Sequence, residues 1–276
     1  MIASKNTVEI NNTLLKDIEK SFASLLMQDI FQKVLQLAKL DTNVFIIGEI
    51  GSGKKKIAEI IHQNSTRSAK PFYSFYCIDI NEDNYKDTFW GHLHFEQNQL
   101  TLKYEALEQT EGGILYLDQF SELSPQYMLN IITSLDKGIH QLYRSENSSK
   151  PRMILSFNQE SYQDLINSSV WDTLLNQLDP VVIMLPPLRE RKEDIPILIN
   201  NFLKEIKELN KDYRSLKMSP QAMYDCFNYS WPGNIRQLKN AILQGAILSL
   251  GKTIKSEHLP FTMSWNLPYK LDSGKM

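Results

Sequence analysis

The sequence has few of the residues that build thiol or zinc chemistry. Its two cysteines, Cys77 and Cys226, lie far apart and in no CxxC pattern, which predicts small buried apolar residues in a reducing compartment. The five histidines show no zinc-ligand spacing beyond the pair His92 and His94, and two ligands without a third make a weak metal site. No G-x-S-x-G motif appears, and no nucleophile stands beside a base partner. These absences argue against zinc catalysis and against nucleophilic catalysis.

Long apolar runs and an excess of one charge are also missing. No run approaches the ~18 residues that a membrane span needs, and the first residues are polar. We therefore expect a cytoplasmic protein without a signal peptide or a membrane contact. Lys and Arg total 30, Asp and Glu total 32, and the net charge is −2, so nothing suggests bulk attraction to DNA. The 276 residues, 42% of them hydrophobic, suffice for one large or two small domains with a real core.

The chain is organised around residues 44–58, which read VFIIGEIGSGKKKIA. Four apolar residues predict a buried strand, a glycine-rich turn follows, and residues 55–62 are compatible with a helix. The spacing G-x-x-x-x-G-K is met from Gly48 to Lys54. Glycines let backbone amides face a phosphate, and the helix N-terminus adds partial positive charge at the same place. We therefore expect the phosphates of a nucleotide to bind at Gly48, Glu49, Gly51, Ser52, Gly53, Lys54 and Lys55.

Position 55 departs from the phosphate-loop pattern. A Ser or Thr hydroxyl is expected there to hold Mg²⁺, but the residue is Lys55. A chance glycine-rich turn is the alternative interpretation of the whole stretch. The preceding strand and the following helix favour the nucleotide site over that alternative.

A second candidate residue ends a short apolar run. Residues 114–118 read ILYLD and predict a buried strand with Asp118 at its carboxyl end, the edge where ligands gather in open α/β sheets. Asp118 is therefore a candidate for holding Mg²⁺ through water, as a Walker B aspartate does. The alternative is an aspartate that caps the next helix, which we expect over residues 121–136.

Strands alternate with helices through the first two thirds of the chain. Apolar runs predict strands at 44–47, 71–77, 114–118, 152–158 and 181–185, and helices are expected at 14–40, 55–62, 82–89, 105–110, 121–136 and 161–178. Residues 91–104 have no clear pattern, although 101–104 alternate as part of a hairpin would. This order predicts an α/β fold, a parallel five-stranded P-loop sheet flanked by helices.

The composition changes after Pro187. The strand signals stop, and helices are expected at 194–209, 219–228 and 234–250, the last with Gly251 as its C-cap. We therefore expect a small all-helical subdomain. The predicted organisation is an N-terminal arm (1–22), an α/β core (23–187), a helical lid (188–260) and a tail (261–276) whose aromatic residues pack back on the lid or dock a partner.

Several segments in order resemble one family. They are GEIGSGKKKIAEIIH, KPFYSFYCIDI, the pair Gly91-His92, EQTEGGILYLDQF, SFNQES, LPPLRERKEDIPIL and WPGNIRQLKNAI. Together they are similar to the AAA+ domain of the bacterial enhancer-binding proteins, the activators of sigma-54 RNA polymerase, over about residues 23–260. The resemblance implies an α/β nucleotide-binding core with a helical lid, ATP binding, assembly into a ring and control of transcription.

The resemblance also implies roles for single residues. Lys54 matches the phosphate-binding lysine, and Asp118 matches the Walker B aspartate. Asn158 matches the sensor-one residue that detects the γ-phosphate, and Arg236, in WPGNIRQL, matches the sensor-two arginine that reaches from the lid to the nucleotide. A surface arginine of the lid is the alternative for Arg236.

The positions that hydrolyse ATP in this family are changed. Lys55 replaces a carboxylate, which reverses a charge beside the phosphates. Gln119 replaces the glutamate that polarises the attacking water, so general-base help of about 10²–10⁴ in rate should be missing. Trp171 and Gln177 stand where the family has two arginines that act on a neighbour's nucleotide, and an arginine finger contributes about 10³–10⁵ in turnover. Tyr76 replaces the asparagine that restrains the catalytic glutamate.

The contact with the polymerase is not recognisable either. The GAFTGA loop should follow Gly91-His92, but residues 93–99 read LHFEQNQ. The chain around the AAA+ region is short, so we expect neither a receiver domain nor a DNA-binding domain. We therefore expect a hydrolysis-impaired ATP-binding protein that acts as a regulatory or assembly subunit, with itself or a related AAA+ protein in a ring, in transcription regulation. A working ATPase activator and an interaction module that ignores nucleotide remain as alternatives.

Overall fold

The computed structural model describes residues 22–79, 92–96, 99–103, 110, 112–142 and 150–262. Its centre is a five-stranded parallel sheet in the order β2-β5-β6-β1-β7. The strands are β1 (Val44–Gly48), β2 (Phe72–Tyr76), β5 (Ile114–Asp118), β6 (Arg152–Asn158) and β7 (Val181–Met184). All five strands predicted from the sequence are present, and the predicted α/β fold is confirmed.

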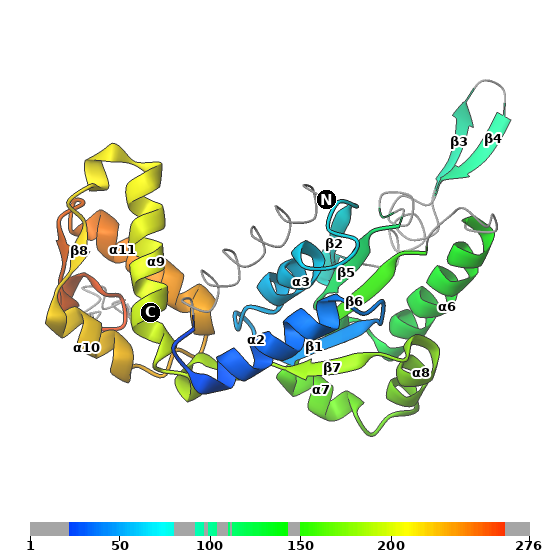
Figure 1. Ribbon diagram of the computed structural model, residues 1–276, viewed down its shortest axis with the longest axis horizontal. Coiled ribbons are helices and arrows are strands. Elements are labelled where there is room, and N and C mark those ends of the chain that lie inside the picture. Colours follow the sequence, from blue (N-terminus) through cyan, green and yellow to red (C-terminus); the bar gives the residue numbers. More distant parts are fainter. Residues whose placement is uncertain are drawn as a thin grey trace, which may run out of the picture.

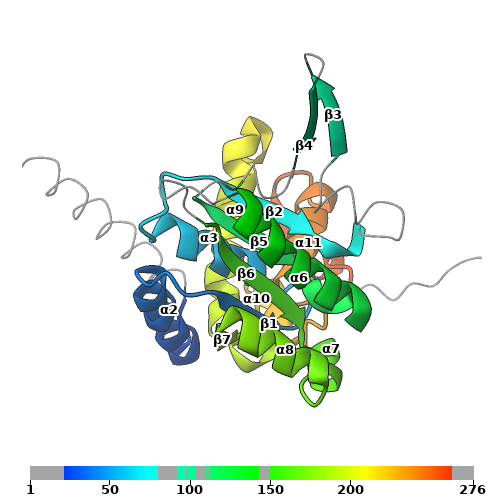
Figure 2. The same cartoon turned by 90° about the vertical axis from the view of Figure 1, so that its right-hand side faces the viewer.

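Helices cover both faces of this sheet (Figure 2). On one face α2 (Leu25–Ala38) and α3 (Lys54–Gln63) pack through residues such as Phe31 and Ile57. On the other face lie α6 (Pro125–Leu142), α7 (Gln159–Leu165) and α8 (Ser169–Leu178). A parallel sheet buried on both faces needs strands without polar alternation, and every residue of β1 is buried.

Three local predictions need correction or refinement. Residues 91–104, expected to be irregular except for part of a hairpin at 101–104, contain a whole antiparallel hairpin, β3 (His92–Glu96) with β4 (Gln99–Lys103), which projects away from the sheet (Figure 1). The helix expected over 161–178 is two helices, since Ser168 caps α8 by accepting the Trp171 amide at 3.3 Å. The helix expected at 121–136 is the 3₁₀ turn η2 (Phe120–Glu122) followed by α6. The arm 1–21 and the helices expected at 82–89 and 105–109 lie outside the described residues.

The helical part of the chain that follows β7, here called the lid, stands at one end of the sheet (Figure 1). It contains α9 (Asp194–Leu209), α10 (Pro220–Asn228) and α11 (Asn234–Leu248), packed around the fully buried Trp231. A short parallel ladder, β8 (Lys217–Met218) with β9 (Thr253–Ile254), was not anticipated. The predicted C-cap Gly251 lies beyond the end of α11, whose C-cap is Ser249. Leu250 and Gly251 follow with left-handed φ values of 51° and 72°, and the Gly251 amide donates to the Ala246 carbonyl.

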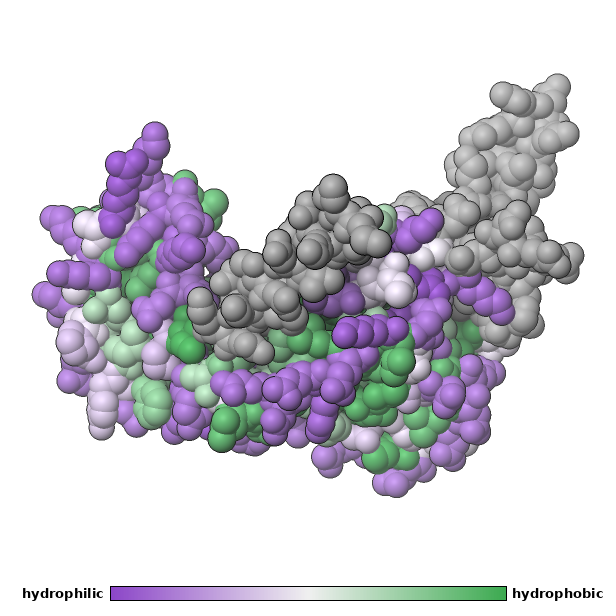
Figure 3. Space-filling model, viewed as in Figure 1, coloured by the Kyte–Doolittle hydropathy of each residue, from purple (hydrophilic) through white to green (hydrophobic). Residues whose placement is uncertain are grey.

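One end of the lid has a polar surface. Figure 3 shows hydrophilic side chains gathered over the upper end of the lid, around the far end of α9.

Phe261, the first residue of the predicted tail, stacks on Tyr229 at 4.4 Å and meets Trp231 edge-on at 5.0 Å. Phe261 thus packs on the lid, and the prediction for the rest of the tail falls on residues 263–276, which lie outside the described part.

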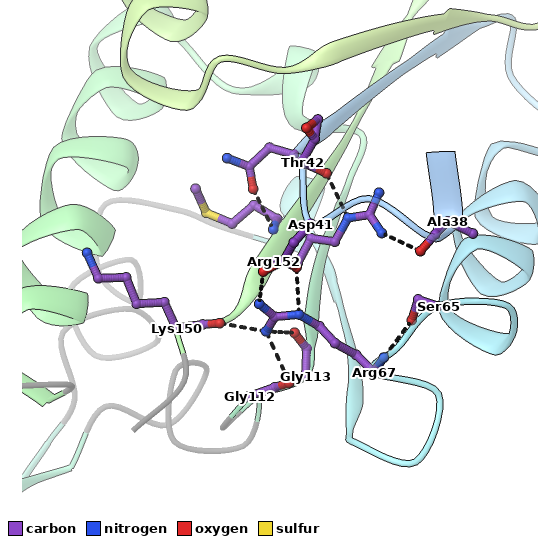
Figure 4. A network of polar contacts seen from close by, with 11 residues as sticks. Ala38, Asp41, Thr42, Ser65, Arg67, Gly112, Gly113, Lys150 and Arg152 are labelled. Atoms are coloured by element: carbon purple, nitrogen blue, oxygen red, sulfur yellow. Dashed lines mark hydrogen bonds and ion pairs between the residues drawn. The ribbon is translucent and has the colours of Figure 1, made fainter. Parts of the chain in front are cut away.

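Two arginines bind main-chain carbonyls at the amino-terminal ends of the strands (Figure 4). Arg67 pairs with the Asp41 carboxylate at 2.7 and 2.8 Å, and its Nη1 reaches the carbonyls of Gly112, Gly113 and Lys150. Arg152, which is buried, donates to the carbonyls of Thr42 and Leu37. Planar guanidinium groups suit several acceptors at once, so this network joins loops that precede β1, β5 and β6 on the edge opposite the phosphate loop.

The two cysteines are free and buried, as predicted. Burial raises the pKa of Cys226 to about 12 and raises the pKa of Cys77 as well. A thiol that stays protonated is a poor nucleophile and a poor metal ligand. Both residues therefore serve as small apolar side chains of the core.

Candidate functional site

A cavity of about 290 Å³ opens at the carboxyl edge of the sheet, between the phosphate loop and the lid. Its walls come from the loop, from the start of α3, from the end of β5 and from the first turns of α11. The lining residues are Ile50, Gly51, Gly53, Lys54, Lys55, Asp118, Gln119, Ile235, Arg236 and Lys239. Residues far apart in the sequence thus meet at the place where ligands bind in open α/β sheets.

The phosphate loop, residues 48–53, has the backbone that its glycines predict. Gly51 and Gly53 adopt left-handed φ values of 77° and 104°, and α3 begins directly at Lys54. A β-carbon on Gly51 would lie 2.4 Å from the Gly233 carbonyl oxygen of the lid, so only glycine fits between the two segments. The helix N-terminus and the loop amides together form a ready anion site.

Lys54 is the buried cation of this loop. Its Nζ donates to the carbonyl oxygens of Gly48 at 2.7 Å and Glu49 at 3.0 Å, and the residue is only 6% exposed. Burial lowers the pKa of the lysine to about 8, against the opposing attraction of Asp118 and with a further lowering by Arg236. The ammonium group therefore loses its proton at a lower pH than an exposed lysine does.

Asp118 lies at the end of β5 and is held by two hydroxyls. Its Oδ1 accepts hydrogen bonds from Tyr116 Oη at 2.8 Å and from Ser156 Oγ at 2.7 Å. Burial together with the Asp118 charge raises the pKa of Tyr116, which keeps this hydroxyl a donor. The next residue, Gln119, has a left-handed backbone, and its amide donates to Ser156 Oγ at 2.8 Å. Asp118 thus faces the cavity, and its described hydrogen bonds go to the sheet rather than to a helix N-terminus.

The lid grips the phosphate loop through side chains that carried no role in the sequence analysis. Arg189 donates to both carboxylate oxygens of Glu49, at 2.7 and 2.9 Å. The fully buried Asn234 donates to Glu49 at 3.0 Å and to the Ile50 carbonyl at 3.1 Å, and it accepts the Leu188 amide at 2.7 Å. The sequence shows the two motifs that contain Arg189 and Asn234, but only the folded chain shows that both side chains bind Glu49.

Two more contacts complete this junction. The amide of Ile235 donates to the Gly51 carbonyl at 3.0 Å, and Arg191 Nη2 donates to the Ser52 carbonyl at 2.7 Å. Burial lowers the pKa of Arg191 to about 10, against the attraction of Asp194. The buried hydroxyl of Ser52 has no hydrogen-bond partner among the described residues. The backbone carbonyls of residues 48–52 are therefore all bound, either by the lid or by Lys54.

The cavity is rich in cations. Lys54, Lys55, Arg236 and Lys239 line it together with one carboxylate, Asp118. Lys239 pairs with Glu205 of α9, with Nζ to oxygen distances of 2.9 and 3.0 Å. Lys55 and Arg236 are exposed and have no ion pair within the described residues. The open part of the cavity therefore presents positive charge, which suits a polyanionic ligand.

Four of the expected site residues lie outside the lining of this cavity: Gly48, Glu49 and Ser52 of the phosphate loop, and Asn158. Asn158 is the one of the four that does not belong to the loop. It ends β6, its Cα is paired in register with that of Gly48, and its backbone amide donates to Ser121 Oγ at 2.8 Å. Tyr76 is similarly paired with Asp118 across β2 and β5. Asn158 thus lies on the strand next to the phosphate loop, and Tyr76 lies on the strand next to Asp118, as their places at the strand ends predict.

Trp171 and Gln177, which the resemblance aligned with the family's trans-acting arginines, differ in their surroundings. Trp171 is 5% exposed and packs between Phe45, Phe157 and Tyr162, with ring centroids 5.1 to 5.4 Å apart. Gln177 is exposed. The first position is therefore part of the hydrophobic core in this chain, where no side chain can extend toward a neighbouring molecule.

The comparisons with known proteins agree with this geometry. A family model described as the Sigma-54 interaction domain matches residues 21–184, and one described as the AAA+ ATPase lid domain matches residues 189–272. The first model alone covers more than half of the 276 residues. This chain belongs to the sigma-54 interaction domain family. The resemblance read from the sequence is thus confirmed, and the family's name applies to the fold described above.

Relatives of this sigma-54 interaction domain include the transcriptional regulatory protein ZraR of Escherichia coli K12, 30% identical over 245 residues, which cover 86% of this chain and 54% of ZraR. The Nif-specific regulatory protein of Herbaspirillum seropedicae is 31% identical over 238 residues, covering 84% and 43%. The chain thus spans about half the length of these curated relatives. The crystal structure of NtrX from Brucella abortus in complex with ADP matches with a TM-score of 0.71 and 27% identity, over 94% of this chain and 61% of that one.

Within the described ranges, no helix is both long enough and apolar enough to cross a membrane. The same residues contain no group of three or more His, Cys, Asp or Glu side chains placed to hold a metal ion.

Proposed function

We propose that this sigma-54 interaction domain binds an adenine nucleotide, ATP or ADP, and hydrolyses it weakly or not at all. Residues 23–187 serve as the nucleotide-binding core and residues 188–260 as the lid. Binding is carried by one observation, the cavity in which Lys54, Lys55 and Arg236 meet between loop and lid. The NtrX structures with ADP and with ATP support the choice of ligand.

Impaired hydrolysis rests on the side chains at the reacting end of the cavity. Gln119 lines it where the family has a glutamate, and an amide can orient water but cannot accept its proton. Trp171 is locked in the core. A neighbouring copy therefore offers no charge from that position to the γ-phosphate, and this is the group that contributes about 10³–10⁵ in related phosphoryl-transfer sites.

The remaining proposed roles follow from nucleotide binding with impaired hydrolysis. Arg236 contacts the phosphates from the lid, and Asn158 senses them from the end of β6. Among the lining residues only Asp118 is a carboxylate, so a bound Mg²⁺ would rest on that side chain. No step of the proposed function depends on the metal.

The proposed partners come from the family. Transcriptional regulators such as ZraR and the Nif-specific protein are its relatives, so we propose a regulatory or assembly role on the transcription machinery in the cytoplasm. The chain would join copies of itself or a related AAA+ protein in a ring. Size-exclusion chromatography with light scattering, with and without ATP, tests the assembly.

Two measurements on the purified full chain test the nucleotide proposal. Titration with a fluorescent ATP analogue should saturate, and Lys54→Ala should abolish saturation. ATP turnover, measured by phosphate release, should stay far below that of an active relative assayed alongside. Turnover at the relative's rate would instead identify a working ATPase, and an absence of saturable binding would identify an interaction module that ignores nucleotide.

A further inference from the structure

The ligands expected of Mg²⁺ in a phosphate-loop protein are poorly represented in this cavity. Such proteins hold the ion with a hydroxyl directly after the loop lysine and with the Walker B aspartate. Here the hydroxyl position carries the cation Lys55, and the neighbour of the aspartate is the amide Gln119. Mg²⁺ demands oxygen ligands in near-octahedral geometry, and an ammonium group beside the site repels it. The donor set therefore does not fit a tightly bound metal.

The one remaining carboxylate is itself partly engaged. Oδ1 of Asp118 accepts hydrogen bonds from Tyr116 and Ser156 at 2.8 and 2.7 Å. These two donors satisfy one oxygen and withdraw negative charge from a would-be metal ligand. The nearby carboxylate of Glu49 is also engaged, since Arg189 donates to both of its oxygens. Glu122 also attracts Lys54, but it is not part of the lining, so negative charge among the residues that line the cavity is low.

Positive charge at the same place is high. Lys55 is exposed, lines the cavity and has no ion pair within the described residues. Arg236 also lines the cavity, is exposed and has no ion pair within the described residues. The buried Lys54 lines the same cavity. By contrast, Lys56 forms an ion pair with Glu59 at 3.5 Å on the exposed side of α3 and is not part of the lining. Lys55 is therefore the added cation that belongs to the site.

We propose that this site binds the phosphates of its nucleotide without requiring Mg²⁺, because Lys55 supplies the positive charge that the metal supplies elsewhere in the family. This inference rests on the proposed nucleotide binding and specifies its ligand as the metal-free polyphosphate. It also accounts for the loss of the carboxylate after Lys54, because a cation at that position replaces the charge of the metal.

The test is a titration of the full-length protein with the fluorescent ATP analogue in excess EDTA and again in excess MgCl₂. The Kd should be the same in both buffers within about threefold, well inside the tenfold that corresponds to about 1.4 kcal/mol. Binding that appears only with MgCl₂ would overturn the inference and leave the proposed function standing. An absence of saturable binding in both buffers would overturn both.

Matched variants separate Lys55 from general electrostatics. Lys55→Glu, which places a carboxylate at the family's position, should weaken binding in EDTA by at least about tenfold, the effect of losing one charge-assisted contact. MgCl₂ should then recover part of the affinity. Lys56→Glu makes the same change of charge one residue further along the same helix and should leave the Kd within about threefold. Equal weakening by both variants would contradict a direct role for Lys55. Thermal melts confirm that each variant is folded.

Discussion

The carboxylate of Glu49 and the guanidinium of Arg189 meet in two parallel hydrogen bonds of 2.7 and 2.9 Å. Glu49 belongs to the phosphate loop and Arg189 to the start of the lid, so the pair joins the two halves of the site. Asn234 adds a third bond to the same carboxylate at 3.0 Å. The conformation of the loop that receives the phosphates therefore depends on the position of the lid.

This junction predicts unequal effects of its two lid residues on stability. Asn234→Ala should lower the free energy of unfolding by about 1–3 kcal/mol, since it removes a fully buried amide and leaves buried groups without partners. Arg189→Ala should cost less than about 1 kcal/mol, because its side chain is 42% exposed. Urea denaturation measures both values, and a larger cost for Arg189→Ala would contradict this account. Hydrogen exchange at residues 48–53 should quicken in both variants.

Nucleotide affinity should depend on the protonation of Lys54. Its pKa is lowered to about 8, first by burial, so the free lysine loses its proton as the pH rises through that value. Phosphate oxygens beside the amine favour the charged form, so the complex holds a proton that the free protein lacks above this pKa. The affinity for the ATP analogue should therefore fall by about tenfold from about pH 7 to about pH 9. Calorimetry in two buffers should detect the proton uptake, and a flat pH profile would contradict it.

Restoring the catalytic carboxylate alone should recover little turnover. Gln119→Glu returns a group that can accept a proton from water, and general-base help amounts to about 10²–10⁴ in rate. The charge that a neighbour supplies in the family is still missing, because Trp171 is buried. Phosphate release by the variant should thus remain far below that of an active relative. A large gain from this single change would favour the working-ATPase alternative.

Placing an arginine at position 171 should destabilise the fold much more than placing one at position 177. Trp171→Arg removes an aromatic side chain from among Phe45, Phe157 and Tyr162 and buries a charge, so unfolding should become easier by more than about 3 kcal/mol. Gln177→Arg changes an exposed residue and should alter stability by no more than about 0.5 kcal/mol. Thermal denaturation of the two variants side by side compares these costs. Equal stability would show that the Trp171 position can be refilled without repacking.

The sheet was predictable because its signals are local. Five apolar runs, each ended by a turn or a polar residue, predict five buried strands, and alternation with helices makes them parallel. The hairpin of β3 and β4 was predicted in part, since the alternation at 101–104 indicated its second strand. Its first strand was missed, although residues 92–96, HLHFE, also alternate between polar and apolar side chains. The break between α7 and α8 was missed because Ser168 acts as a cap, which a helical periodicity alone does not reveal.

The site divides in the same way. The sequence alone predicted the phosphate loop and Asp118, because glycine spacing and a carboxylate at a strand end carry their chemistry in the local order of residues, and the family resemblance added Gln119 and Arg236. Only the tertiary structure decided that Glu49 is held by Arg189 and Asn234, that Asp118 is bound by Tyr116 and Ser156, and that Trp171 is sealed in the core. These relationships join residues far apart in the chain, and the distance between two such side chains is set by the packing of the sheet against the lid.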